Sequence, residues 1–341
     1  MARSPFSIRE FKGLDNKHDP KTLVEIEKKQ AAAYATAATN VDFDVNFGVT
    51  RRRGWSLELP GICHSLWTSP DKAYTLVVKD GVLGLLDTSL NFTALQAASD
   101  RFFAYTDTGA GIYMSDGQSI YRLDTSGPSL DVMSRAGTYD PSTRVVDADE
   151  DEVIYDHPLP GTVLQWMFGR LWVANEYGVF YSRAYRPDQF NLANDYLDLR
   201  NITMIAPVDD GYYLGTQELV YFVAGTNPKM PTPTAVVCDI GAIPRSAAVL
   251  PASQFKEGAE GDVVVWESIR GKLLGRNSGA VEFMIDEHVA YPTADYAATL
   301  LREMNGEVHH IAALANKNTE GSNMRATDIA VAEVRRNGIL I

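Results

Sequence analysis

The stretch GRLWVANEYGVFYSRA, Gly169 to Ala184, holds an apolar segment, a polar turn and a second apolar segment. This order is typical of two antiparallel strands joined by a tight turn. Similar units recur along the chain. They are YTLVVKDGVLGLLD (Tyr74–Asp87), AGIYMSDGQSIYRLD (Ala110–Asp124), DGYYLGTQELVYFVAG (Asp210–Gly225), GDVVVWESIRGKLLGRN (Gly261–Asn277) and, more weakly, ATLLREMNGEVHHIAALA (Ala298–Ala315). The sequence is therefore built largely from repeated hairpins.

The spacing of these hairpins predicts the architecture. The first five turn centres are Asp80, Asp116, Glu176, Gln217 and Arg270. They are 36, 60, 41 and 53 residues apart. A blade of a β-propeller takes roughly 40 residues. Two spacings therefore fit one blade each, and the other two leave room for insertions, which we place at 140–160 and 253–261.

We expect an all-β protein and, within that class, a β-propeller with six blades favoured and five possible. One four-stranded sheet cannot bury both of its faces alone, whereas sheets stacked around an axis bury them all. We expect the strand at 41–47 and the tail at 327–334 to pair and close the ring. A β-sandwich also contains many short strands and remains the alternative.

One helix is expected near the N-terminus. Asp19-Pro20 is a typical helix start, and Leu23 and Ile26 begin a helical spacing that continues into an alanine-rich tract. We predict a helix over 21–38. The chain would then divide into an N-terminal arm, 1–40, and a propeller domain, 41–341.

Composition excludes several classes of protein. The chain has 31 basic and 44 acidic residues and a net charge of −13, which argues against duplex binding by the whole chain. No apolar run is long enough for a membrane-spanning helix, and the first residues lack the apolar core of a secretion signal. Cys63 and Cys238 have no metal-binding spacing, so we expect a reducing compartment and no disulfide scaffold.

Candidate metal sites are weak. The acidic run 147–152 imitates the start of a calcium loop, but Glu152 stands where glycine is needed and Pro158 where the bidentate ligand is needed. A surface loop, or a contact with a basic patch of a neighbouring subunit, is the expectation. Neighbouring side chains on a strand point to opposite faces, so His309 and His310 cannot both serve one site.

Candidate catalytic groups are equally sparse. Cys63, beside His64, is expected to be a buried structural cysteine. A glycosidase would require two carboxylates converging at the centre of the propeller. The available carboxylates are Asp209, Asp210, Glu218, Asp262 and Glu267. Hydrolase, zinc-protease and nucleotide-binding motifs are absent from the sequence. We therefore expect a protein that is not an enzyme and has no cofactor or metal.

Two parts of the sequence resemble a known family. The N-terminal part is FKGLDN (Phe11–Asn16), DPKTL (Asp19–Leu23), ATNVDFD (Ala38–Asp44) and RRRG (Arg51–Gly54). The second part is GRLWVANEYGVFYSR (Gly169–Arg183) followed by PDQFN (Pro187–Asn191). In this order they resemble tail nozzle (tail tubular B) and tail-stabilisation, or head–tail junction, proteins of bacteriophages. This chain is shorter than most nozzle proteins.

The resemblance implies a structural virion protein made in the host cytoplasm. It implies a homo-oligomeric ring, a hexamer in our expectation, around the DNA-ejection channel below the portal. The partners would be other copies, the portal or adaptor and other tail proteins, while double-stranded DNA passes without specific binding. A net charge of −13 fits a conduit that does not hold DNA. The alternative is a monomeric propeller that binds a host receptor or glycan.

The docking residues of such a ring are expected in the N-terminal arm, in the basic cluster and in the acidic run. They are Phe11, Leu14, Arg51, Arg52, Arg53, Asp147, Asp149 and Asp151.

Overall fold

The stretch Gly169–Ala184 forms β17 (Arg170–Ala174) and β18 (Val179–Tyr181), the two central strands of a four-stranded antiparallel sheet in the computed structural model. The structure describes residues 10–15, 24–27, 30–35, 41–43, 49–51, 59–98, 101–124, 129–132, 144–146, 152–229, 234–254, 259–284, 294–304, 307–315, 330–332, 335–336 and 339–340.

Five four-stranded sheets follow one another along the chain, and in each of them consecutive strands pair as a simple meander. Blades 1 and 2 contain β6 (Cys63–Thr68), β7 (Thr75–Lys79), β8 (Val82–Leu86), β9 (Phe92–Ala97), β10 (Ala104–Asp107), β11 (Ile112–Ser115), β12 (Ile120–Asp124) and β13 (Ser129–Val132). Each predicted hairpin within these blades forms the second and third strands.

Blades 3 to 5 repeat the same meander. Their strands are β16 (Val163–Met167), β17, β18, β19 (Tyr196–Leu197), β20 (Met204–Val208), β21 (Gly211–Gly215), β22 (Val220–Ala224), β23 (Thr234–Cys238), β24 (Ala248–Pro251), β25 (Asp262–Ser268), β26 (Gly271–Gly275) and β27 (Val281–Phe283). Two short 3-10 helices, η3 (Ala252–Gln254) and η4 (Asn277–Gly279), lie in the connections of blade 5.

A sixth sheet follows. It contains β28 (Tyr296–Met304), β29 (Glu307–Ala315), β30 (Ala330–Ala332), β31 (Arg335–Arg336) and β32 (Ile339–Leu340). Met304 pairs with Glu307, so the predicted turn at 305–306 connects β28 and β29, although those two residues lie outside the described ones. We call this sheet blade 6.

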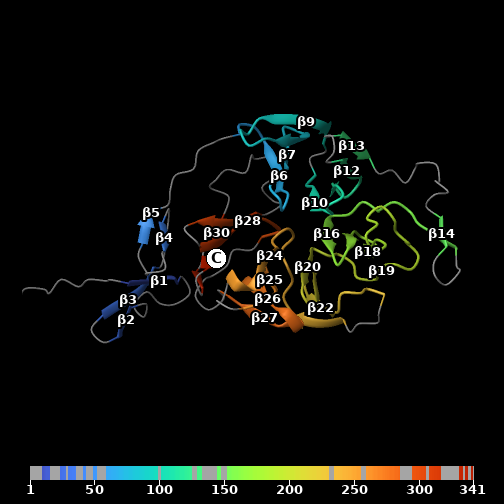
Figure 1. The fold of residues 1–341 in the computed structure, drawn as a ribbon. Coiled ribbons are helices and arrows are strands. Elements are labelled where there is room, and N and C mark those ends of the chain that lie inside the picture. The colour runs from blue at the N-terminus through green and yellow to red at the C-terminus, as the bar shows by residue number, and fades with distance from the viewer. Residues whose placement is uncertain are drawn as a thin grey trace, which may run out of the picture.

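The six sheets stand around a common axis, with β6, β10, β16, β20, β24 and β28 nearest to it (Figure 1). The innermost strands of blades 2 to 6 contact one another in sequence order. Each pair of neighbouring blades from 1 to 5 shares a buried core, and a smaller one joins blades 5 and 6. The protein is therefore an all-β protein with a β-propeller fold.

Alternating side chains explain how one strand serves two interfaces. Trp172 packs in the core shared with blade 4, whereas its neighbours Leu171 and Val173 pack in the core shared with blade 2. Likewise Tyr212 faces blade 3 and Tyr213 faces blade 5. Successive residues of a strand point to opposite faces, so a strand between two neighbours buries both sets. Aromatic side chains of the central strands therefore belong to the cores between blades.

The predicted N-terminal helix is wrong for the described part of 21–38. Val24–Glu27 forms β2 and Gln30–Ala35 forms β3, which pairs on one edge with β2 and on the other with β1 (Glu10–Leu14). Pairing on both edges supplies β3 with hydrogen-bond partners for its backbone, and this outweighs the weak helix preference of alanine. The alternation of valine and isoleucine with glutamate in VEIE also fits a strand.

The expected ring closure also differs from the pairing in the structure. β4 (Val41–Phe43) pairs with β5 (Val49–Arg51) in a separate hairpin, and the tail strand β30 pairs with β29 inside blade 6. Only five residues of the sequence, 44–48, separate β4 from its partner β5, and pairing of segments so close in the chain costs little loop entropy. The first strand of the meander is β6.

The longer of the two predicted insertions is confirmed. β14 (Arg144–Val146) and β15 (Glu152–Ile154) form a two-stranded hairpin of their own between blades 2 and 3. This hairpin accounts for the wide spacing of the turns at Asp116 and Glu176. The shorter insertion, 253–261, falls between β24 and β25, and 255–258 lie outside the described residues.

Candidate functional site

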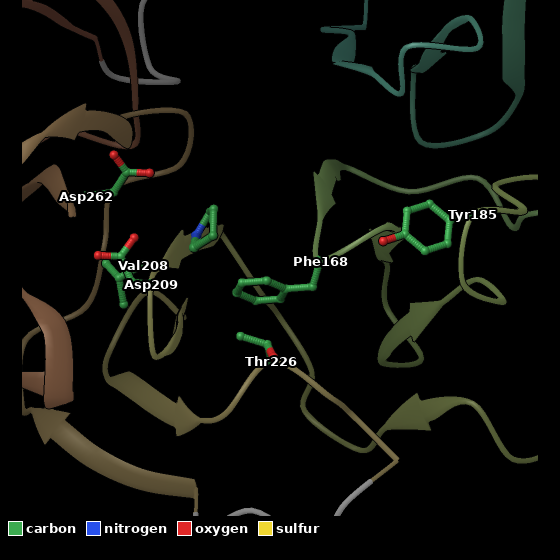
Figure 2. Close-up of a pocket in the computed structure, with 7 residues that line it drawn as sticks. Phe168, Tyr185, Val208, Asp209, Thr226 and Asp262 are labelled. Carbon is green, nitrogen blue, oxygen red and sulfur yellow. The ribbon is translucent and has the colours of Figure 1, made fainter.

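An open pocket of about 480 Å³ lies on one face of the propeller, where blades 3, 4 and 5 meet (Figure 2). In a meander, the turn between the first and second strands and the turn between the third and fourth lie on the same face. The pocket takes its lining from these turns. The lining residues are Phe168, Tyr185, Pro207, Val208, Asp209, Thr226 and Asp262.

Two carboxylates form one side of the pocket. Asp209 sits in the tight turn between β20 and β21, and Asp262 is the first residue of β25. A Cβ atom on Gly261 would lie 1.8 Å from Asp209 Oδ2. The Asp209 carboxylate therefore packs directly against Gly261, the residue that precedes Asp262. Partial burial of Asp262 and, next, the negative charge of Asp209 raise the pKa of the Asp262 carboxyl.

Blade 5 holds the Asp209 turn in place. Asn277 Nδ2 donates a hydrogen bond to Asp209 Oδ2 at 3.2 Å. The neighbouring Asp210 accepts a hydrogen bond from the backbone N–H of Ser278 at 2.8 Å. These bonds join the first turn of blade 4 to the last connection of blade 5, so they fix the Asp209 turn relative to blade 5.

Two aromatic side chains form the rest of the wall. Phe168 and Gly169 make the two-residue turn between β16 and β17, and both have positive φ angles, 51° and 69°. That is the backbone of a type I′ turn, which favours glycine or asparagine and is costly for phenylalanine. The Phe168 ring lies 6.2 Å from the ring of Tyr212, measured between centroids.

Tyr185 stands beside this turn. Its backbone N–H donates to Gly169 O at 2.6 Å, and a ring carbon lies 2.9 Å from where a Cβ on Gly169 would be. The side chain is nevertheless 80% exposed. Figure 2 shows Asp209 and Asp262 on one side of Phe168 and Tyr185 on the other.

The lining determines what the pocket can bind. It has two carboxylates, two aromatic rings and two hydroxyls, on Thr226 and Tyr185, and none of its described residues is basic. Carboxylates and aromatic faces together attract cations. Carboxylates beside an exposed ring also suit the hydroxyls and apolar face of a sugar.

The stretch that resembles phage proteins has a structural role within blade 3. Arg170 Nη1 donates to the backbone oxygen of Ser182 at 2.7 Å, and Ser182 Oγ accepts from Leu171 N at 2.9 Å. Arg183 lies over the Tyr155 ring, 5.6 Å from its centroid. Phe190 is buried and exchanges backbone hydrogen bonds with Asp156 at 2.8 Å. The motif therefore ties the third strand of the blade to the chain on either side of it.

A second cluster lies on the opposite face, close to the axis. The Phe102 ring contacts His64 of β6, with centroids 5.4 Å apart, and Tyr296 of β28, with centroids 5.3 Å apart. The Arg245 guanidinium lies 4.3 Å from the centroid of the same ring. Burial lowers the pKa of Arg245 to about 10. Phe102 thus links blade 1 to blade 6.

A buried polar cluster lies between blades 5 and 6. Lys272 Nζ is 2.6 Å from His310 Nδ1 and 3.2 Å from the His310 backbone oxygen. Glu267 faces the same ammonium group, and all three residues have no exposed surface. The cluster is closed to solvent and connects blade 5 to blade 6.

The structure places few of the predicted docking residues. Phe11 and Leu14 lie on β1, where Phe11 pairs with Ala33 and Leu14 with Ala35, and Arg51 ends β5 opposite Val41. The other predicted docking residues lie outside the described residues. They are Arg52, Arg53, Asp147, Asp149 and Asp151.

The structure does not bring all of the candidate catalytic carboxylates together in one site. Asp209 and Asp262 come together, but on a face of the propeller, whereas Glu267 is paired with Lys272 and Glu218 lies in the turn between β21 and β22. Within the described ranges no three histidine, cysteine or acidic residues are grouped as metal ligands.

The expectation for Cys63 is wrong, because Cys63 is exposed. It is the first residue of β6, at an open end of the strand, and only Cys238 is buried.

The sequence reasoning missed Phe168, Tyr185 and Thr226, since all three lie in turns without periodicity. One signal was present. A Phe-Gly pair occupies a two-residue turn between apolar strands, where the first position favours asparagine or aspartate.

Comparisons with known proteins give only distant similarity. No family model matches the sequence, and a search of curated proteins finds no match. The chain is similar to the Cps50 (Swd1) β-propeller domain of Myceliophteria thermophila, with 13% identity over 80% of this chain and 84% of that chain and a TM-score of 0.43.

Two further solved structures are similar at the same level. The N-terminal domain of Nup159 has 12% identity over 80% of this chain and 77% of that chain, with a TM-score of 0.42. The AfRom2 CNH domain has 10% identity over 79% of this chain and 84% of that chain, with a TM-score of 0.42. These values are low, so the propeller assignment depends on the sheet topology. Within the described residues, no helix has the length and apolar character needed to cross a membrane.

Proposed function

We propose that this chain is a structural subunit of a bacteriophage tail, with no catalytic role, which assembles with copies of itself into a ring around the DNA-ejection channel. One observation carries the proposal. The stretches that resemble nozzle and tail-stabilisation proteins occur in the same order in this chain, and Gly169–Arg183 builds the central strands of a propeller blade.

The charge of the chain supports a conduit role. A net charge of −13 repels the phosphates of passing DNA over a Debye length of about 8 Å at physiological salt. The ring would contact the portal or adaptor and other tail proteins through the arm, 1–40. Its location would be the virion, in the tail or at the head–tail junction.

Mass photometry and light scattering of the purified full chain test the ring. The expected mass is a multiple of 37.5 kDa, six-fold for a hexamer. A variant that lacks residues 1–21 loses β1, which pairs with β3, and is expected to assemble less well. A variant with Arg200→Gln, in an exposed ion pair on blade 3, is the control and should assemble normally.

A ring that needs its neighbours as a template would be monomeric in isolation, so purified particles provide the second measurement. Imaging them at subunit resolution should show propeller density around the channel below the portal. A monomer at all concentrations, together with no such density in the particle, would contradict the proposal.

The pocket favours one alternative function, a monomeric propeller that binds a host receptor or glycan. Tyr185 is 80% exposed and lines the same pocket as Asp209 and Asp262, an arrangement that suits a sugar ring. A glycan array with the monomeric protein, repeated with Tyr185→Ala, tests this alternative. Binding that is lost in the variant would support it.

A further inference from the structure

We infer that the pocket between blades 3, 4 and 5 binds an arginine side chain from the Arg51–Arg53 cluster of a second copy of this chain. The inference rests on the proposed ring and names the contact between its subunits. It is argued from the charge of the pocket, its aromatic walls and the position of the basic cluster.

The charge of the pocket requires a cation. Asp209 and Asp262 line one side, and none of the described lining residues is basic. Partial burial and, next, repulsion by the charge of Asp209 raise the pKa of the Asp262 carboxyl. A guanidinium placed between them removes this repulsion and gains charge-assisted hydrogen bonds.

The aromatic walls favour a flat cation. Phe168 lies between the carboxylates and Tyr185, so a guanidinium beside the carboxylates also meets an aromatic face (Figure 2). Arginine stacks on aromatic rings more readily than lysine does. The strained turn at Phe168 and Gly169 keeps the phenylalanine at this place, where an asparagine turn would leave the wall open.

The occupant is named by charge complementarity. Arg51, Arg52 and Arg53 are the only run of three basic residues in the chain. Arg51 ends β5, and Figure 1 shows β5 at the left, outside the propeller, with β16 and β18 of blade 3 on the far side of the axis. The cluster of one copy therefore reaches the pocket of another copy more readily than its own, which is the head-to-tail arrangement that closes a ring.

Peptide binding tests the pocket without the ring. The probe is the acetylated and amidated peptide of residues 48–55, GVTRRRGW. It is titrated calorimetrically into the full chain with Arg51→Gln, Arg52→Gln and Arg53→Gln, whose own cluster no longer fills the pocket. Asp209→Asn with Asp262→Asn should raise the dissociation constant roughly tenfold, since two partly exposed ion pairs are lost. Asp198→Asn with Glu176→Gln removes two charges elsewhere in blade 3 and should change it less than twofold.

Oligomer mass tests the occupant. Arg51→Gln, Arg52→Gln and Arg53→Gln together, or the two pocket substitutions, should each lower the oligomer mass, whereas the control pair leaves it unchanged. A ring that persists in both variants overturns the inference and leaves the proposed function standing. Peptide binding with a monomeric wild-type chain supports the pocket and counts against self-assembly.

Other outcomes point to different sites. Equal peptide affinity with and without the two pocket substitutions, measured in the chain that lacks the arginine cluster, overturns the inference. The inference is also overturned if Asp147→Asn, Asp149→Asn and Asp151→Asn together weaken peptide binding while the two pocket substitutions do not. Binding of methyl glycosides by the pocket, with none of the peptide, would assign the pocket to a sugar.

Discussion

The side-chain nitrogen of Lys272 lies 2.9 Å from Glu267 Oε1, and neither side chain has any exposed surface. The pair lies on β25 and β26 of blade 5 and faces His310 of blade 6. Charges buried this completely are tolerated only when they neutralise each other and their hydrogen bonds are made. The seam between blades 5 and 6 therefore depends on a polar contact as well as on apolar packing.

Breaking this pair should be costly. Lys272→Met leaves the Glu267 carboxylate buried without its cation and should lower the free energy of unfolding by about 3–5 kcal/mol. Adding Glu267→Leu should recover most of the loss, because no buried charge then remains. Urea unfolding measures both variants, and Arg200→Gln, in an exposed ion pair, should change stability by less than ~0.5 kcal/mol. A loss below ~1 kcal/mol for Lys272→Met would mean that the pair does not form.

Stability should fall in mild acid because of His310. Burial and, next, the charge of Lys272 hold the pKa of His310 well below 6.5, so the folded state keeps the imidazole neutral. Glu267 Oε1 is 3.6 Å from His310 Nδ1 but is neutralised by Lys272. The unfolded chain takes up a proton near pH 6.5, so it gains stability relative to the folded chain as the pH falls.

Between pH 7.5 and pH 5.5 this effect should remove about 1.4 kcal/mol from the free energy of unfolding. Urea unfolding at several pH values measures the loss. His310→Gln should reduce the slope, whereas His157→Gln, at an exposed position, should keep it. An unchanged slope in His310→Gln would place the acid sensitivity elsewhere.

The hydroxyl of Tyr213 joins blades 4 and 5. It donates to Arg276 O and lies 3.1 Å from Ala280 O, both in the last connection of blade 5. Tyr213→Phe keeps the ring packing and removes the hydrogen bond, so stability should fall by about 1 kcal/mol. The change appears as a lower urea midpoint with an unchanged slope. Tyr221→Phe on the next strand, half-buried, should cost less, and an equal loss would argue against the interblade bond.

Thiol labelling reports the packing of blade 4. Cys63 is exposed and Cys238 is buried at the end of β23, so a thiol reagent should modify one cysteine in the folded chain and two in denaturant. Burial and, next, the charge of Asp80 raise the pKa of the Cys63 thiol above its usual 9.0. Labelling should therefore be slow at neutral pH and accelerate as the pH rises. Cys63→Ser should abolish it, and fast labelling of both thiols would mean that β23 is not packed.

The hairpins were predictable because they form the middle of each blade. β21 is buried along its whole length, and both faces of such a strand require apolar side chains. The outer strands carry a weaker signal. Thr234, Ala235 and Val236 of β23 are exposed, and nothing in their sequence distinguishes them from a loop.

The N-terminal segment was mispredicted for the opposite reason. Alanine permits both helix and strand, so the tract around β3 depends on its neighbours β1 and β2, whose pairing is not local information. The sequence indicated only some of the residues that line the pocket. Asp209 and Asp262 are obvious as charges, but Phe168 and Tyr185 acquire a role only when turns from three blades meet.

The contact between Phe102 and Tyr296 has a mechanical consequence. In the part of the chain that the structure describes, blades 1 and 6 share no strand, and aromatic rings 5.3 Å apart hold this side of the circle. A contact between two tilted rings yields to tension sooner than a ladder of backbone hydrogen bonds does. A pull on the two ends of the chain would therefore open the propeller between blades 1 and 6 while the other blade junctions stay intact. Optical tweezers would record this opening as a small step at low force, before any blade unfolds.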